Sequence, residues 1–331
     1  MTRSRALSLL SGGLDSLLAI CVLREQGIEV SGITFVSPFF GAKHAKEAAK
    51  NLGCEIIVID ITEKHLELVK NPPHGYGKYM NPCIDCHAMM IKKAGETALV
   101  QGYDFIATGE VLGERPMSQN RKSLDLVARM SGFDEILLRP LSARLLEPTK
   151  PEIDGLVDRE RLFAIEGRSR RPQMQLAKKY GIKEYIQPAG GCLLTDPIFS
   201  KKLRRLFKMK PEANAFEIGL LKLGRQFLLP SGARLVLGRD EAENARLKAY
   251  AEGNGGGALF VSDTIPGPTA FLETSSCGQD GELAAKICAS YSKHGGLAVE
   301  FNVKDAKGEF KIIASPVDKS EFERFKDQEI F

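Results

Sequence analysis

Short β-rich runs alternate with helical patterns through the first half of the chain, and this alternation restricts the fold more than any other feature. An apolar run at residues 6–10 stops at Ser11, and apolar residues at helical spacing follow over residues 14–24. Further strands are expected at residues 29–35, 55–61, 105–108 and 135–139, and further helices at residues 42–52 and 87–100. This pattern predicts an α/β fold, a doubly wound and mostly parallel sheet with helices on both faces. In such sheets, ligands bind beyond the carboxyl ends of the strands.

The alternation weakens after Lys210, where a second, smaller α+β domain is expected. A hairpin is predicted at residues 227–237, with Pro-Ser-Gly at its turn. The remaining elements are helices at 242–250 and 282–293 and strands at 258–262, 297–303 and 310–314. A chain of 331 residues suits two domains at roughly 150 residues each. We therefore divide it into domains of residues 1–212 and 213–331.

Composition excludes several classes of protein. Hydrophobic residues make up 43% and charged residues 27%, values of ordinary globular domains rather than disordered or collagen-like chains. No run of about 18 apolar residues is present, so no transmembrane helix is expected. The N-terminus lacks the small-residue cleavage site of a signal peptide. Seven cysteines, an odd number, do not suggest a disulfide framework, so we expect a protein of the reduced cytoplasm with no membrane partner.

Positive charge is concentrated in one segment. Residues 161–210 contain thirteen Lys and Arg against three acids, which gives +10, whereas the whole chain carries +4 and the remainder therefore −6. Such asymmetry favours a polyanionic partner over a merely solvated helical face. The candidate RNA-binding residues in this segment are Arg168, Arg170, Arg171, Lys201, Lys202, Arg204 and Arg205.

The hexapeptide SGGLDS lies between the first expected strand and helix and has the features of an anion-binding loop. Gly12 and Gly13 let the backbone approach a phosphate without a Cβ clash. The helix that follows presents free N–H groups and the positive end of its dipole. Ser11 and Ser16 add hydroxyl donors, and Asp15 is a candidate ligand for Mg²⁺. The alternative is a glycine-rich turn that serves only chain reversal.

This hexapeptide resembles the SGGxDS signature of the PP-loop (N-type) ATP pyrophosphatases, which cleave ATP between the α- and β-phosphates and adenylate a substrate oxygen. A second loop, ATGEVLGERPMSQ, resembles a segment of the tRNA 4-thiouridine synthetases, and the LRPL downstream is typical of these enzymes and of tRNA 2-thiouridylases. By position, Thr108 and Gly109 are expected near the ATP. Arg115 and Gln119 are candidates for substrate or phosphate contact, with a surface ion pair as the alternative for Arg115.

Three cysteines suggest a sulfur or metal centre. Cys83 and Cys86 form a C-x-x-C that follows a proline and precedes an expected helix, and Cys192 lies in a glycine-rich turn. Three interpretations remain open: a structural zinc completed by His87 or His74, a redox pair that carries a persulfide, and a 4Fe-4S cluster on three thiolates. Within the resemblance to cluster-dependent PP-loop tRNA thiolases, Cys83, Cys86 and Cys192 match the cluster ligands, and this interpretation is favoured.

The other cysteines and histidines receive no role in chemistry. Cys21, Cys54 and Cys288 are expected in the core, Cys277 lies in a loop, and His44, His65, His74 and His294 lack metal-ligand spacing.

Two elements of the C-terminal domain resemble the NFACT RNA-binding domain. They are LVLGRDEAEN, which contains Arg239, and LFVSDTIPGP, in which Phe260 and Ser262 replace the usual Trp and His. The resemblance implies contacts from Arg239, Asn244 and Arg246 to phosphate or sugar. The alternative is a small domain used for dimerisation, and a homodimer is compatible with either interpretation.

Together these resemblances imply an ATP-dependent tRNA sulfurtransferase that adenylates a uridine carbonyl and replaces its oxygen with sulfur. ATP, Mg²⁺ and a 4Fe-4S cluster are the implied cofactors, and sulfide or a persulfide donor protein is the implied source of sulfur. The ATGEVLGERPMSQ loop favours 4-thiouridine, whereas the Asn-Pro-Cys context of Cys83 is typical of 2-thiouridylases. One alternative is a PP-loop enzyme that acts on a small molecule and contains structural zinc. The other is a non-catalytic RNA-binding factor.

Overall fold

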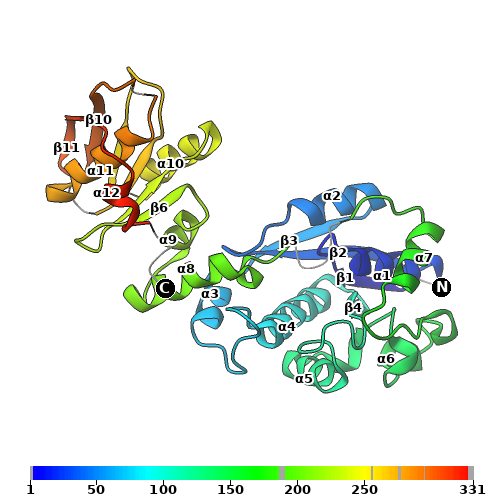
Figure 1. The fold of residues 1–331 in the computed structure, drawn as a ribbon. Coiled ribbons are helices and arrows are strands. Elements are labelled where there is room, and N and C mark those ends of the chain that lie inside the picture. The colour runs from blue at the N-terminus through cyan, green and yellow to red at the C-terminus, as the bar shows by residue number, and fades with distance from the viewer. Residues whose placement is uncertain (1–2, 186–190, 255, 275–276, 294, 327–331) are drawn as a thin grey trace. The chain divides into compact units, whose positions relative to one another are not determined.

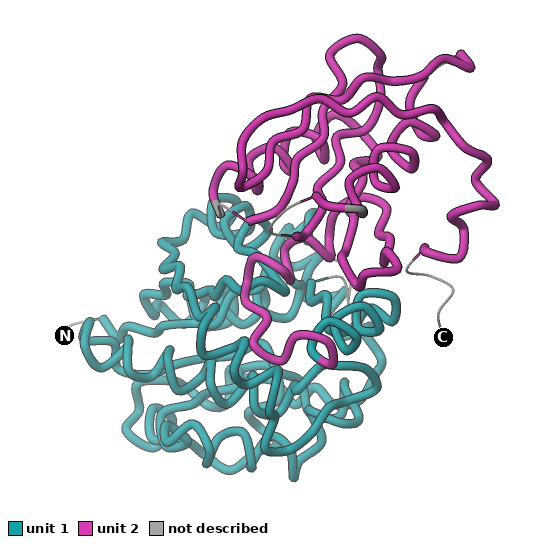
Figure 2. Tube along the Cα trace, turned by 90° about the vertical axis from the view of Figure 1, so that its left-hand side faces the viewer, with its two compact units in different colours: residues 1–207 teal, residues 208–331 magenta. Residues whose placement is uncertain are grey.

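The computed structural model describes residues 3–185, 191–254, 256–274, 277–293 and 295–326. The chain divides into two compact units, Met1–Phe207 and Lys208–Phe331 (Figure 2). Each unit is considered by itself below.

The first unit is built on a five-stranded parallel sheet in the order β3-β2-β1-β4-β5 (Figure 1). Its strands are β1 (Arg5–Leu9), β2 (Glu29–Val36), β3 (Ile56–Asp60), β4 (Phe105–Ala107) and β5 (Leu137–Leu138). Its α-helices are α1 (Leu14–Glu25), α2 (Lys43–Leu52), α3 (Thr62–Lys70), α4 (Cys83–Gln101), α5 (Arg121–Ser131), α6 (Lys150–Ile153), α7 (Arg171–Lys179) and α8 (Pro197–Met209), which runs on across the division. Short 3₁₀ helices occur at Asp134–Ile136, Ala143–Leu145, Arg159–Arg161 and Leu193–Thr195.

Alternating side chains of the central strand face two separate cores. Ala6 packs into one core together with α1, α2 and α7, and Leu7 packs into the other with α4 and α5. A strand buried on both faces needs apolar residues at successive positions, as in a parallel sheet covered by helices. The predicted doubly wound α/β fold is therefore confirmed.

Most boundaries in this unit agree with the sequence pattern to within a residue or two. The main error is α4, which was expected to begin at His87 and begins at Cys83, directly after Pro82. Both cysteines of the C-x-x-C thus lie in the first helical turn rather than before the helix. The expected strand at 135–139 is reduced to Leu137–Leu138 because a 3₁₀ turn occupies the preceding residues.

The second unit is an α+β fold, as predicted, with a six-stranded antiparallel sheet in the order β11-β10-β8-β9-β7-β6. Its strands are β6 (Arg225–Leu228), β7 (Arg234–Leu237), β8 (Ala258–Val261), β9 (Ala270–Glu273), β10 (Val299–Asp305) and β11 (Gly308–Ala314). Its helices are α9 (Ala215–Leu220), α10 (Glu241–Asn254), α11 (Gly278–Ser290) and α12 (Ser320–Glu323). On β7, Leu235 and Leu237 face the core of α11, whereas Val236 faces the core that contains Leu247 of α10.

Among the described residues, no helix combines the length and the apolar character needed to cross a bilayer.

Candidate functional site

The SGGLDS loop connects β1 to α1 at the carboxyl edge of the parallel sheet. Hydrogen bonds from its two serines stabilise the conformation of the loop. The Ser11 hydroxyl accepts from the amide of Gly13 at 3.2 Å, and Ser16 Oγ donates to the Gly13 carbonyl at 2.7 Å. Gly12 has φ +83°, and a Cβ there would lie 2.9 Å from the backbone of His44. No side chain caps the first turn of α1. A compact loop in front of an uncapped helix N-terminus is suited to bind phosphate.

The loop after β4 closes over the start of α1. The amide of Thr108 donates to the carbonyl of Leu138 at 3.0 Å, which continues the sheet. A Cβ on Gly109 would lie 2.5 Å from the carbonyl carbon of Asp15 and the amide nitrogen of Ser16. The structure thus brings Gly109 against the SGGLDS loop, whereas Thr108 bonds to Leu138 and Glu110. This is the point where the chain order of the strands reverses, between β1 and β4, which is the usual ligand position in such sheets.

Asp15 belongs to an ion cluster of two carboxylates and one guanidinium. Arg170 Nη2 lies 3.1 Å from Asp15 Oδ2, and Arg170 Nη1 lies 3.3 Å from Glu114 Oε1. Burial raises the pKa of both carboxyls, against the opposing charges of Arg170 and Arg115. Gln173 is completely buried, hydrogen-bonds no group through its side chain, and lies close enough to act on the pKa of Asp15. These groups form a polar site next to the predicted phosphate loop.

Cys83, Cys86 and Cys192 are brought together, although Cys192 is distant in sequence. The segment after Cys192 is anchored by the Leu193 amide, which donates to the Phe39 carbonyl at 3.0 Å. Burial raises the pKa of Cys86 well above its ordinary value, and the neighbouring Cys192 and Cys83 raise it further. Burial also raises the pKa of Cys192 to about 11. Within the described part of the chain, no group of three or more Cys, His, Asp or Glu side chains is arranged to hold a metal ion.

The positive charge of Arg115 connects the two sites. It opposes the raised pKa of Asp15 and also that of Cys192. The charge of Arg115 acts on both groups, and the Leu193 amide bonds to Phe39, which follows β2, so the phosphate loop and Cys192 lie toward the same edge of the sheet. Gln119, the other candidate in this loop, is buried, and its side-chain oxygen has no hydrogen-bond partner.

His65 is a site residue that the sequence analysis missed. Its Nε2 lies 3.4 Å from Cys86 Sγ, and its ring packs between Phe39 and Phe40, with centroid distances of 5.4 and 5.1 Å. Burial lowers the pKa of His65 to about 4, so the imidazole is neutral at neutral pH. Its Nδ1 is buried without a hydrogen-bond partner. No local motif marks it, since it lies on α3, 21 residues before Cys86.

Glu110 is the centre of a buried network that supports both the cysteines and the β4 loop. It accepts from Arg139 Nε at 2.9 Å and from His87 Nδ1 at 2.9 Å, and the Thr108 hydroxyl donates to it at 3.2 Å. On the same helix as His87, the buried Asp85 accepts from His74 at 2.6 Å. The histidines proposed as zinc ligands therefore have carboxylate partners. The ATGE motif contains Glu110, and its position after a predicted strand could have identified it.

The predicted RNA-binding residues differ in their surroundings. Arg168, Arg171, Lys201 and Arg204 are exposed, whereas Lys202 and Arg205 are half-buried and have interactions of their own. Arg170 lies in the ion cluster around Asp15. In the second unit, Arg239 pairs with Glu243 at 2.6 Å.

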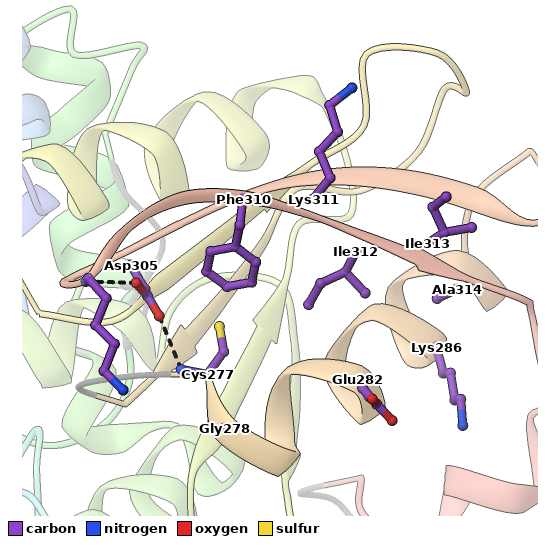
Figure 3. Close-up of a pocket in the computed structure, with 11 residues that line it drawn as sticks. Cys277, Gly278, Glu282, Lys286, Asp305, Phe310, Lys311, Ile312, Ile313 and Ala314 are labelled. Atoms are coloured by element: carbon purple, nitrogen blue, oxygen red, sulfur yellow. Dashed lines mark hydrogen bonds between the residues drawn. The ribbon is translucent and has the colours of Figure 1, made fainter.

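A separate cavity of about 690 Å³ lies in the second unit, between α11 and the hairpin of β10 and β11 (Figure 3). Cys277 and Phe310 point toward one another across it. Asp305 accepts from the amides of Cys277 and Lys307 at 3.3 and 2.8 Å. Lys286 and Lys311 also line it, and Lys311 is paired with Glu300 at 2.7 Å. All the residues that line the cavity belong to the second unit. None of the predicted nucleotide-binding residues is among them, and neither are Cys83, Cys86 and Cys192.

Comparisons with known proteins agree with the motifs. Residues 1–144 match the family model described as thiamine biosynthesis protein (ThiI), and residues 224–326 match the model described as NFACT protein RNA binding domain. The chain is 27% identical over 198 residues to the "Probable tRNA sulfurtransferase" of Thermoanaerobacter pseudethanolicus, covering 48% of this chain and 50% of that protein. It is also 27% identical over 236 residues to a tRNA-specific 2-thiouridylase of Syntrophus aciditrophicus, covering 62% of this chain and 61% of that protein.

Among solved structures, a 4-thiouridine synthetase–RNA complex with bound ATP is similar, with a TM-score of 0.36 and 20% identity, covering 66% of this chain and 52% of that chain. The chain spans 50% to 61% of the length of the two relatives named above. The predicted resemblances, to PP-loop tRNA-thiolation enzymes and to the NFACT RNA-binding domain, are confirmed.

Proposed function

We propose that this protein is an ATP-dependent tRNA sulfurtransferase, in which residues 1–212 carry out the chemistry and residues 213–331 help to bind RNA. The observation that carries the proposal is that the SGGLDS loop follows β1 and that the segment of Cys192 bonds to Phe39, which follows β2, so that both lie toward the same edge of the parallel sheet. An activating nucleotide and a sulfur source must both reach the same base. Two sites at one edge of the sheet allow both to act on a base that is bound there. The relatives of the first unit are named for tRNA sulfur transfer.

In the first step the SGGLDS loop binds the ATP phosphates and the substrate uridine approaches from the open side. The carbonyl oxygen of the base attacks the α-phosphorus, and the bond from this phosphorus to the β-phosphate bridging oxygen breaks. Pyrophosphate leaves, and the base carries AMP on its oxygen. The uncapped amides of α1 are placed to stabilise charge on the phosphates, in a loop whose shape is held by the hydroxyls of Ser11 and Ser16.

The chemistry of Asp15 fits a divalent cation, because a carboxylate oxygen is a preferred ligand of Mg²⁺. The buried Gln173 amide lies beside it. Bound Mg²⁺ would neutralise phosphate charge. Gly109, which packs against the loop, and its neighbour Thr108 would hold the nucleotide in place.

In the second step a sulfur nucleophile attacks the activated carbon of the base, the carbon–oxygen bond breaks, and AMP leaves. We propose that Cys83, Cys86 and Cys192 handle this sulfur. Three thiols form a donor set that fits an iron–sulfur centre. As thiolates, Cys83, Cys86 and Cys192 would hold such a cluster, and it would supply exogenous sulfide for the transfer. The persulfide route uses the same thiols without metal. A persulfide donor protein passes its outer sulfur to one of the cysteines, this persulfide attacks the base, and a second cysteine thiolate then breaks the S–S bond, so that the two cysteines end as a disulfide.

Two measurements test the proposal. The first is mass spectrometry of nucleosides from a defined tRNA incubated with the protein, ATP and sulfide. We expect 4-thiouridine or 2-thiouridine together with AMP and pyrophosphate, no product from Asp15→Asn, and normal product from Cys277→Ala. ATP turnover that needs no RNA and yields no thiolated base would contradict the proposal and favour a small-molecule substrate.

The second measurement is iron, acid-labile sulfide and zinc in anaerobically purified protein. About four irons and four sulfides per chain, lost in Cys192→Ala and kept in Cys277→Ala, would support the cluster. One zinc without sulfide would exclude it.

A further inference from the structure

We propose that Arg170 is a phosphate-binding residue of the nucleotide site. Without ligand its guanidinium pairs with two carboxylates, and it pairs with phosphate instead when a metal–nucleotide complex binds. The inference rests on the proposed nucleotide site. It departs from the sequence interpretation, which groups Arg170 with its neighbours as a contact for RNA.

Three arginines within four residues have different surroundings. Arg168 and Arg171 are exposed, but the side chain of Arg170 is 24% exposed and is directed to the phosphate loop. Its guanidinium joins Asp15, in that loop, to Glu114, in the loop after β4. A side chain that bridges two largely buried carboxylates is not available to a tRNA surface.

The backbone around Arg170 is fixed on both sides. The Gly167 amide donates to the Leu112 carbonyl at 2.7 Å, and Leu112 and Glu166 form a parallel bridge. Arg170 itself precedes the first residue of α7, whose Leu176 and Ala177 pack in the same core as α1. Only the side chain therefore has freedom to change partners.

The charges of Arg170 and of a divalent cation bound to Asp15 predict that the guanidinium changes partners. A divalent cation on Asp15 would lie beside the guanidinium, and the two positive charges would repel each other. Phosphate groups remove this conflict, because the guanidinium has five N–H donors and can pair with phosphate instead. The metal therefore enters readily only together with the nucleotide.

This exchange gives opposite expectations for two ligands. Without Arg170, Asp15 and Glu114 keep only the electrostatic effect of Arg115, and a divalent cation becomes a better partner for them. The affinity for Mn²⁺ alone should then rise, while the affinity for the metal–nucleotide complex should fall. A residue with only a structural role would not move these two affinities in opposite directions.

The experiment compares the full-length wild type with Arg170→Gln, Arg170→Lys and Arg171→Gln. Binding of Mn²⁺ alone is measured by electron paramagnetic resonance. Binding of Mg²⁺ with an ATP analogue that has a methylene group between its α- and β-phosphorus is measured by calorimetry. For Arg170→Gln we expect at least tenfold weaker analogue binding and at least threefold tighter Mn²⁺ binding. Arg170→Lys should be intermediate, because it keeps the charge without the paired donors. Arg171→Gln should match the wild type in both assays.

Other outcomes overturn the inference. Wild-type analogue affinity in Arg170→Gln excludes a phosphate role, and an accompanying loss of tRNA affinity equal to that of Arg171→Gln would return Arg170 to the RNA surface. Weaker analogue binding without tighter Mn²⁺ binding would leave Arg170 as a structural ion pair. If the wild type itself does not bind the analogue, the proposed nucleotide site fails as well.

Discussion

At the scale of single residues, Glu110 lies at the centre of a buried charge network in the first unit. Burial alone would raise its pKa, but Arg139 and His87 outweigh this effect and hold the pKa well below its ordinary value. We expect Glu110→Gln to lower the free energy of unfolding by about 3 kcal/mol, because the buried Arg139 loses its carboxylate. Urea denaturation at neutral pH measures it.

The pH dependence of this contribution has a definite sign. Because the folded-state pKa is lowered, the stabilisation is complete above the unfolded pKa of about 4.3 and is lost as the pH falls below it. The difference between wild type and Glu110→Gln should therefore shrink in acid. Glu96→Gln is the control, since its pair with Lys93 is exposed, and should cost less than about 1 kcal/mol. Equal losses in both variants would contradict the assignment.

Cys277 gives a second prediction at this scale. Burial raises the pKa of this thiol to about 11, with added effects from Asp305 and Asp280. Only the thiolate reacts with iodoacetamide, so the rate of alkylation should increase about tenfold per pH unit between pH 7 and 10. Peptide-resolved mass spectrometry follows this one thiol. A rate that levels off near pH 8.5 would contradict the raised pKa. Asp305→Asn should increase the rate at pH 8.

Sequence reasoning identified those site residues that lie within contiguous motifs. The SGGLDS loop could be predicted because its glycines, serines and aspartate act together within one turn. His65 and Gln173 could not, because their roles depend on partners brought close by the fold, Cys86 and Asp15. Glu114 lies inside a motif that was recognised, but its function depends on Arg170, 56 positions later.

At the scale of elements, the regular spacing of apolar residues was sufficient to predict the parallel sheet and the helices α1, α2 and α4. The short strand β9 was missed, because four residues give too little pattern to separate a strand from a loop. The helix α5 was also left unassigned, although Leu124, Val127 and Ala128 are buried at helical spacing. The start of α4 was misplaced because the C-x-x-C was expected to precede the helix, whereas it forms the first turn.

The helix α8 supports a prediction at this scale. Phe199, Leu203 and Leu206 are buried on one face, and Lys201 and Arg204 are exposed on the other. We expect Lys201→Glu with Arg204→Glu to weaken tRNA binding at least tenfold, because both charges are reversed toward the phosphate backbone. Filter binding at fixed salt measures it, and thermal stability should be unchanged.

The control for α8 is the pair Lys122→Glu and Arg129→Glu on α5. These residues are also exposed, and they lie outside the basic segment. Equal weakening by both double variants would mean that net charge alone, rather than the face of α8, determines affinity for tRNA.

At the scale of the whole molecule, the two ligands should respond differently to salt. The basic segment carries +10 and the rest of the chain −6. Even two neutralised phosphates give a slope of about −1.8 in log affinity against log salt, or roughly tenfold between 50 and 200 mM. We expect at least this loss for tRNA and a smaller one for the ATP analogue, measured by titration at both salt concentrations. A tRNA affinity that does not change with salt would contradict the electrostatic assignment.

The position of β1 at the centre of its sheet has a consequence for how the protein is made. The amide of Arg5, at the start of β1, donates to Asp104, 99 residues later and just before β4. The ribosome therefore releases the complete SGGLDS sequence long before the strand that flanks it exists. Until β4 has paired with β1 and Gly109 has packed against Asp15, that side of the loop lacks the packing contacts of the folded protein. A nucleotide that binds only the finished arrangement stabilises finished molecules and leaves growing chains unaffected. ATP, the substrate of the proposed reaction, would thus stabilise only chains whose folding is complete.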